Sequence, residues 1–395
     1  MDTTDMLPSW RHLPSSLHVL TDPRWMAESR FSHQVAARLQ QAFALLRHGG
    51  GQLSAYLDAC ALACSCLTLS QSPRQRLQVF HALGLAYLGL GELAQALTTV
   101  EIAVDLAEGL PDLAACAELA YLAGSLARGQ GKYALGADYL AYAAALLVDL
   151  GDEDDPADTA LMIDTLTMHA TCLYALQGYD AAWAAIDWAR LLVSRPPGDP
   201  LRAASIAWVA AILHRWTGDS ARGLEQALAA SEVYALQGTS TSHQMALGRL
   251  QTIVAECALD LAAASSAGLV GFGHETYLRI AGPAVRRATL LARETHDIGG
   301  GGTALLARVR EERLRGRGTD RLATIGSVLK RASRLGEPDL AIQAYTVRGD
   351  EFAARQELGS ALASYRLADE LSTRHTVPVL GLFSRRALGR ASEGQ

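Results

Sequence analysis

The chain has 395 residues, half of them hydrophobic and 19% charged, which is ample material for a folded core. Its polar, proline-interrupted start and its lack of a long uncharged apolar run predict a cytoplasmic protein without leader or membrane span. The net charge of −6 is uneven, with −11 on residues 1–200 and +5 on residues 201–395. This asymmetry suits a dipolar or charged partner, although aspartate-rich loops clustered early in the chain would produce it too.

Residues 1–27 predict an N-terminal arm rather than a helix. Pro8, Pro14 and Pro23 interrupt the segment, because proline breaks a helix. Trp10 and Trp25 make it too apolar for a simple solvated tail. We expect the arm either to pack on the first hairpin, to lie in a groove, or to be a disordered leader.

The first helical hairpin is expected over 28–48 and 52–69, followed by the clearest internal pattern, over 77–110. Numbered from Leu77, this stretch has small residues at positions 8, 20 and 27, a large residue at 7 and an aromatic residue at 11: Gly84, Ala96, Ala103, Leu83 and Tyr87. Small residues let two antiparallel helices approach closely, and large ones fill the gaps. The pattern resembles the tetratricopeptide repeat.

Further copies of the pattern begin at Ala117, Ile163, Ala204 and Ile342. The first starts are 40, 46 and 41 residues apart, longer than the basic repeat of about 34. Long repeats of this kind are similar to the repeat domains of bacterial LuxR- and MalT-type regulators and signal-transduction ATPases, over residues 28–390. The resemblance implies an all-α fold, a right-handed α-solenoid of helical hairpins.

Glycine punctuation divides the chain into four parts. After the arm, a first repeat block is expected over 28–265 and a second over 303–395, ending in a capping helix over 377–390. Between them, 266–302 is expected to be a helical insertion with glycine-rich hinges, Gly268–Gly273 and Gly299–Gly302, with its helix broken at Gly282-Pro283.

The resemblance implies that the first helix of each hairpin lines a concave groove. The inward repeat positions predict these groove-binding residues: His81, Glu118, Tyr121, Arg128, Asp164, Tyr174, Trp208, Arg215, Trp216, Arg308, Arg315 and Asp350. Trp208, Arg215 and Trp216 are predicted to form a pocket for a peptide or a helical segment, since aromatic and arginine residues anchor many interfaces. The alternative is that the tryptophans pack between neighbouring hairpins.

The usual catalytic, cofactor and metal patterns are missing. No lysine follows Gly299–Gly302 as a phosphate-binding loop requires, and His274-Glu275 lacks the second histidine of a zinc protease. Cys60, Cys64 and Cys66 lack the further ligands of a closed zinc site. We therefore expect no cofactor and no bound metal.

The favoured function is an interaction scaffold or regulatory sensor that binds a peptide or protein, with a small-molecule signal as an alternative ligand. A second hypothesis is an enzyme whose acid–base groups come from His81, Glu118, Tyr121, Asp164 and Tyr174. A third uses the arginines of 308–321 to bind nucleic acid. Against the third, Arg308 with Glu312 and Glu311 with Arg315 have the spacing of helical salt bridges.

Overall fold

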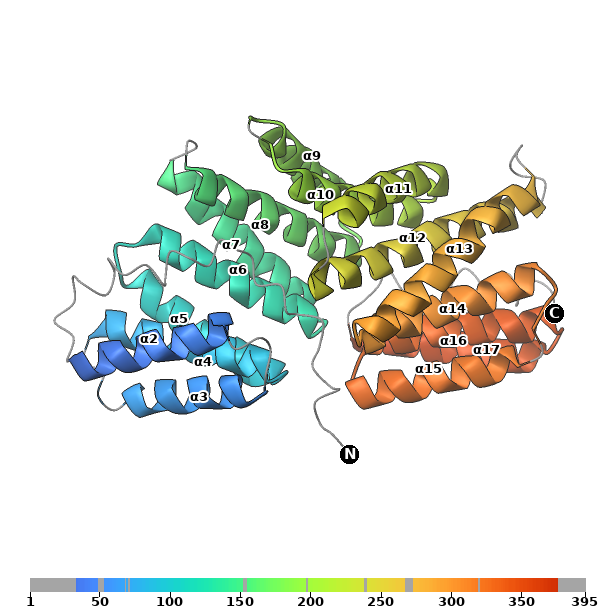
Figure 1. Ribbon diagram of the computed structural model, residues 1–395. Helices are drawn as coiled ribbons and strands as arrows, with labels where there is room; N and C mark the ends of the chain where they lie inside the picture. The colour runs from blue at the N-terminus through green and yellow to red at the C-terminus, as the bar shows by residue number, and fades with distance from the viewer. Residues whose placement is uncertain are drawn as a thin grey trace. The chain divides into compact units, whose positions relative to one another are not determined.

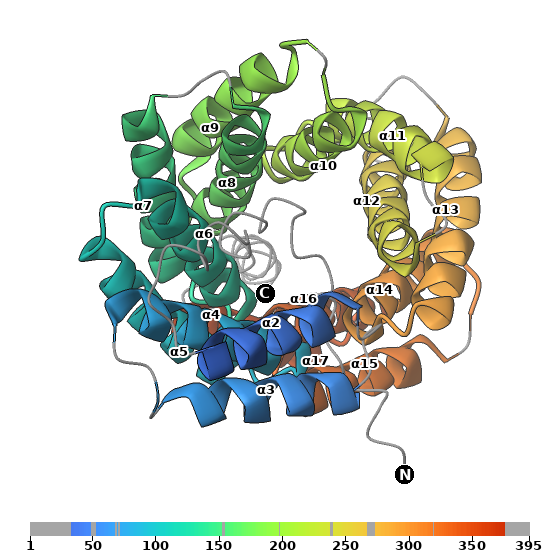
Figure 2. The ribbon, with the colours of Figure 1, turned by 60° about the vertical axis from the view of Figure 1, so that its left-hand side comes forward.

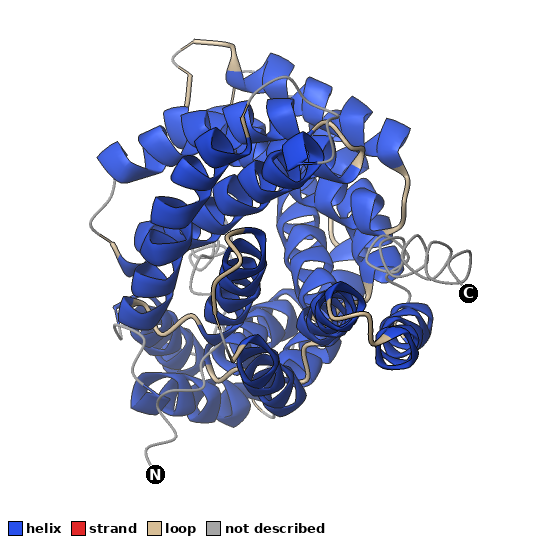
Figure 3. Ribbon diagram, turned by 90° about the vertical axis from the view of Figure 1, so that its right-hand side faces the viewer, coloured by secondary structure: helices blue, strands red, loops and turns tan. Residues whose placement is uncertain are grey.

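The computed structural model describes residues 33–375, apart from 49–52, 68, 70–71, 152–154, 197, 238–239, 267–272 and 319. Every described element is a helix, and none is a strand (Figures 1 and 3). By contacts, the chain divides into two units, residues 1–172 and 173–395, which are treated separately. This boundary falls inside α8, at a different place from the predicted joint at 266–302.

The first unit contains three helical hairpins and the start of a fourth. Its helices are α2 (His33–His48), α3 (Leu53–Leu67), α4 (Pro73–Gly89), α5 (Leu93–Glu108), α6 (Leu113–Gly129), α7 (Tyr133–Leu150) and most of α8 (Pro156–Ala175). Residues next to a helix determine where it begins. Ser72 and Gln75 form a capping box that pairs with backbone N–H groups at the start of α4. By length and composition alone, α7 could cross a membrane, but its Leu140 and Ala143 are buried within the unit.

The second unit contains the remaining helices. They are α9 (Tyr179–Val193), α10 (Pro200–Trp216), α11 (Ser220–Gln237), α12 (Thr241–Ser266), α13 (His274–Glu294), α14 (Ile298–Leu314), α15 (Arg321–Leu335), α16 (Pro338–Ala354) and α17 (Leu358–Arg374). The hairpins α10–α11 and α16–α17 agree with the repeat copies predicted to begin at Ala204 and Ile342.

Within each unit the helices form two layers. The even-numbered helices come first in their hairpins and contact one another, α2 with α4 in the first unit and α10, α12, α14 and α16 in series in the second. We call these helices the first-helix layer and their odd-numbered partners the second-helix layer. Figure 2 shows the pairing, with α6 beside α7 and α12 beside α13.

Glycines at repeat position 8 set the distance between the helices of a hairpin. A Cβ atom on Gly124 would lie 2.6 Å from Leu140 Cγ and 3.1 Å from the carbonyl oxygen of Gly136. A Cβ on Gly349 would lie 2.4 Å from the ring of Tyr365. The small-residue pattern read from the sequence is therefore a packing requirement.

Two of the predicted glycine-based breaks, at Gly299–Gly302 and at Gly282-Pro283, are helical in the structure. Gly299–Gly302 lie in the first turns of α14, where Asp297 caps the helix by accepting a hydrogen bond from Gly300 N at 3.0 Å. A Cβ on Gly302 would lie 2.7 Å from Leu340 Cδ2, so this glycine permits close packing instead of bending. Likewise, α13 continues through Gly282 and Pro283.

Several predicted segments lie outside the described residues. They are the N-terminal arm over 1–27, the capping helix over 377–390 and the glycines before 273. The four-part division of the chain stays a prediction.

Candidate functional site

A network of charged side chains joins three first helices of the second unit. Asp260 on α12 accepts a hydrogen bond from Arg215 Nε on α10 at 2.8 Å and another from Arg310 on α14. Arg215 also reaches Glu256, with 2.6 Å between Nη1 and Oε2. The guanidinium groups of Arg215 and Arg310 thus converge on one carboxylate.

The electrostatics keep this network ionised. Burial alone would raise the pKa of Asp260, but Arg215 and Arg310 hold that pKa below its ordinary value. Burial would lower the pKa of Arg215, but Asp260 and Glu256 raise it above its ordinary value. Each charge compensates the desolvation of the other, which is the condition for keeping ionised groups in a protein interior.

A second network joins α14, α15, α16 and α17. Arg321 Nε donates to Glu351 Oε2 at 2.6 Å, and Arg313 Nη2 lies 3.4 Å from Asp350 Oδ2. Tyr365 donates its hydroxyl hydrogen to Asp350 Oδ1 at 2.8 Å. Glu351 is fully buried, and its contact with Arg321 pairs this interior carboxylate with a guanidinium group.

The arginines of 308–321 are therefore largely committed to carboxylates. The predicted helical pairs are confirmed, with 2.9 Å between Arg308 and Glu312 and 2.9 Å between Arg315 and Glu311. Arg310, Arg313 and Arg321 bind acidic groups on other helices. Such pairing neutralises the proposed nucleic-acid face.

The three residues of the predicted pocket are placed differently from one another. Trp208 packs against Tyr234 on α11, with ring centroids 6.3 Å apart, and belongs to the hydrophobic cluster between hairpins. The guanidinium carbon of Arg215 lies 5.8 Å from the centre of the Trp216 ring. The seven-residue spacing on one helix separates Trp208 from Arg215 by about 10 Å along the axis, and the pocket stays a prediction.

Comparisons with known proteins support the fold. No protein-family model and no curated protein matches the sequence. Among solved structures, the apo quorum sensor NprR from B. thuringiensis matches with a TM-score of 0.62, 10% identity, and coverage of 90% of this chain and 92% of that chain. A Rap protein complexed with competence and sporulation factor matches with a TM-score of 0.56, 14% identity, and coverage of 92% and 99%.

The Rap conjugation gene regulator of plasmid pLS20, in complex with the Phr* peptide, also matches. Its TM-score is 0.54, its identity is 11%, and 86% of this chain and 96% of that chain are covered. This chain has a tetratricopeptide-like repeat fold. The predicted fold class is confirmed.

In the first unit of this tetratricopeptide-like chain, three predicted groove residues are buried instead of open to a ligand. His81 is 0%, Glu118 2% and Tyr121 5% exposed, and their role in groove binding stays a prediction. Of the remaining predicted residues, Arg128, Asp164, Tyr174, Arg215, Trp216, Arg315 and Asp350 are half-buried, and Arg308 is exposed. The repeat register identifies the helix face, but side-chain packing decides what is accessible.

His81 lies in an apolar environment against the ring of Phe43, with 5.6 Å between centroids. Neither ring nitrogen has a hydrogen-bond partner among the described residues. Burial lowers the pKa of His81 to about 4, so the imidazole is neutral at pH 7. The described residues therefore place no proton donor or acceptor within hydrogen-bond distance of the His81 ring nitrogens.

Glu256 and Asp260 are the site residues that sequence reasoning missed. They follow Arg215 by 41 and 45 residues, so no helical spacing signals the contact. They lie in α12, outside the repeat copies identified in the sequence.

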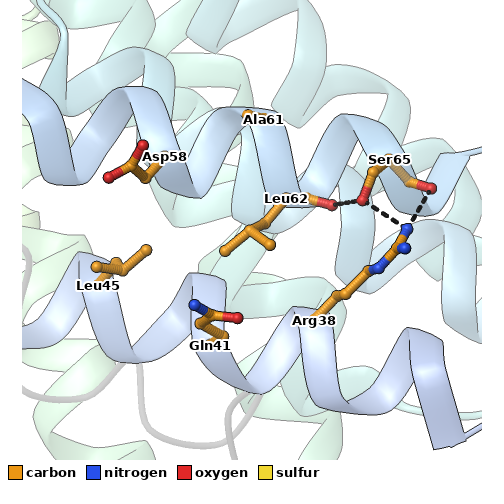
Figure 4. Close-up of a pocket in the computed structure, with 7 residues that line it drawn as sticks. All are labelled: Arg38, Gln41, Leu45, Asp58, Ala61, Leu62 and Ser65. Carbon is orange, nitrogen blue, oxygen red and sulfur yellow. Dashed lines mark hydrogen bonds between the residues drawn. The ribbon is translucent and has the colours of Figure 1, made fainter.

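A shallow hollow of ≈ 500 Å³ lies between α2 and α3. Figure 4 shows its lining, in which Arg38 reaches across to Ser65 with 3.0 Å between Nη1 and Oγ. Asp58 and Gln41 on its rim are exposed. In the described part of the chain, no group of three or more His, Cys, Asp or Glu side chains could hold a metal ion.

Proposed function

We propose that the chain is a cytoplasmic tetratricopeptide-type scaffold or regulatory sensor that binds a peptide, or a peptide segment of a protein, on its first-helix layer. It needs no cofactor for this work. Support comes from fold neighbours that include a quorum sensor and a regulator in complex with the Phr* peptide. Their likeness spans most of this chain.

The observation that carries the proposal is the indole N–H of Trp208. It sits on first helix α10 and is buried without a hydrogen-bond partner among the described residues. A buried donor left unpaired costs about 1–3 kcal/mol. The Trp208 side chain as a whole is half-buried, so a small shift of the side chains that cover the N–H would let the carbonyl of a peptide on the first helices accept its hydrogen. Arg215 and Trp216 at the end of α10 would contact the same ligand farther along.

The test uses peptides selected by display against the full chain, with affinity measured by calorimetry. Replacing Trp208 with Phe keeps an aromatic ring against Tyr234 but deletes the donor. We expect Trp208→Phe to raise the dissociation constant about fivefold to tenfold, as loss of one hydrogen bond predicts. The melting temperature should change little.

The matched control is Trp188→Phe, at a tryptophan that is 40% exposed on second helix α9. It should leave affinity unchanged. Equal weakening by both substitutions, unchanged binding to Trp208→Phe, or failure to select any peptide would contradict the proposed site. Hydrogen exchange of the complex should show protection in α10 and α12, not in α11 and α13.

A further inference from the structure

The second-helix layer of the second unit carries a row of exposed arginines on α13. Arg279, Arg286 and Arg293 recur every seven residues and lie on the exposed side of the helix, with Arg287 beside them. Leu290, between Arg286 and Arg293, is 45% exposed. We call these five residues the basic face.

In the part of the chain that the structure describes, these arginines differ from those on α14 because they form no ion pair with a carboxylate. No ion pair within the described residues involves Arg279, Arg286, Arg287 or Arg293. On the same helix, Glu275 pairs with Arg315, and Glu294 is the one other acidic side chain. The four arginines of the basic face outnumber the two acidic side chains of α13, so this helix surface has a net positive charge.

In the first unit, second helix α5 presents the opposite charge. Glu101, Asp105 and Glu108 follow one another at four and three residues, and α5 contains no lysine or arginine. Ile102 among them is 39% exposed. We call these four residues the acidic face, and no salt bridge within the described part of the chain neutralises its carboxylates.

The neighbouring Tyr139 on α7 reports the same concentration of negative charge. It donates to Glu101 Oε1 at 3.3 Å. Burial, followed by the charges of Glu101, Asp105 and Glu108, raises the pKa of Tyr139 to about 12. Second helices α5 and α13 thus carry net charges of opposite sign.

The two faces also match in their apolar content. Each has one exposed aliphatic side chain, Leu290 or Ile102, surrounded by charges. An apolar centre with a charged rim is the usual build of a protein–protein interface. The exposed side of α13 carries no aromatic ring on which a nucleic-acid base would stack.

We propose that the basic face of one copy of the chain binds the acidic face of a second copy. Because the two faces differ, one contact uses the basic face of one copy and the acidic face of the other. Association then continues through the remaining faces unless two or more copies close into a ring. This inference does not depend on the peptide-binding proposal. The contact uses second helices and leaves the first-helix layer free.

The test is a charge exchange between the faces, read by sedimentation equilibrium of the full chain. One variant carries Arg279→Glu, Arg286→Glu and Arg293→Glu, and the other carries Glu101→Lys, Asp105→Lys and Glu108→Lys. In about 10 mM salt, where charges act over about 30 Å, the native chain should show an average mass above 42.0 kDa that rises with concentration. Salt at about 1 M should return it to the monomer.

Each variant alone should remain monomeric, because both of its faces then have the same sign. An equimolar mixture of the two should recover the higher mass, since each altered face meets its altered counterpart. A control with Arg222→Glu, Arg366→Glu and Arg374→Glu reverses three exposed arginines elsewhere and should associate like the native chain. Circular dichroism checks that all variants are folded.

Four results would overturn the proposal. Three of them are a native chain that stays at 42.0 kDa in low salt, variants that still associate alone, and a mixture that does not recover the higher mass. A fourth is binding of duplex DNA or RNA by the native chain that the α13 variant loses while its self-association persists. That result would assign the basic face to nucleic acid.

Discussion

His81 illustrates how packing changes the chemistry of a single side chain. Histidine in water has a pKa of about 6.5, but burial against Phe43 lowers the pKa of His81 to about 4. The unfolded chain therefore binds a proton between about pH 6.5 and pH 4 that the folded chain does not. Stability linked to His81 is complete above that window and falls as the pH falls through it.

We predict that His81→Phe flattens the acid dependence of stability. The native chain should lose about 3 kcal/mol of unfolding free energy through His81 as the pH falls from about 6.5 to about 4. The variant should lack this loss and should be at least as stable at pH 7, because the ring nitrogens have no hydrogen-bond partners among the described residues to lose. Urea unfolding, followed by circular dichroism at several pH values, measures the unfolding free energy of both chains.

The control is His375→Phe, at an exposed position after α17. It should keep the native pH dependence. If His81→Phe also keeps it, the imidazole is not held neutral in the folded chain.

Glycines in the helix pairs show that helical propensity and packing oppose each other. Alanine is favoured over glycine by about 1 kcal/mol inside a helix. At Gly124 that preference is overruled, because the added methyl group would meet Leu140 and the backbone of Gly136 on the facing helix. At Gly326 in α15, a Cβ would meet nothing within 4 Å.

The same substitution should therefore have opposite effects at these two sites. We expect Gly124→Ala to destabilise the chain by about 1–3 kcal/mol, since α6 and α7 must separate. Gly326→Ala should stabilise it by about 0.5–1 kcal/mol through helix propensity. Thermal melts of the two variants test this, and destabilisation by both would show that local strain, not helix contact, selects glycine.

Across several repeats, Asp260 couples hairpins that are far apart in sequence. In a repeat protein, stability comes from each repeat and from its contacts with its neighbours. Asp260 links α12 to Arg215 on α10 and to Arg310 on α14, where the three side chains are 28%, 12% and 17% exposed. One carboxylate thus contributes to two inter-repeat contacts.

We predict that Asp260→Ala destabilises the chain by about 2 kcal/mol, because two partly buried guanidinium groups lose their counter-charge. The control is Asp187→Ala, where a side chain that is 68% exposed pairs with Arg190 at 3.1 Å on the same helix. That exposed pair should contribute less than about 0.5 kcal/mol. Equal effects in urea unfolding would contradict the coupling role.

The same carboxylate sets a separate acid response. The arginines lower the folded-state pKa of Asp260, so its stabilisation is present above the unfolded value of about 3.9 and is lost as the pH falls through the folded value. Asp260→Asn should therefore show a shallower loss of stability below about pH 4 than the native chain. An unchanged slope there would place the acid response in other carboxylates.

The repeat positions by themselves determined most of the fold. Gly84, Gly124 and Gly349 are required by contacts within one hairpin, so their spacing repeats along the chain and identifies the helices. The pairs Arg308–Glu312 and Arg315–Glu311 were also readable, because helix geometry brings residues four apart together. Interactions confined to a few residues leave a local signal.

Tertiary structure alone decided which polar groups are accessible and which charges are paired. Arg215 pairs with carboxylates 41 and 45 residues away. Gly299–Gly302 lie in the first turns of a helix, and His81 is buried. The arginines of α13 and α14 look alike in sequence, yet those of α14 face acidic side chains on neighbouring helices and those of α13 face outward. Desolvation and pairing depend on how hairpins stack, and a sequence records that stacking only indirectly.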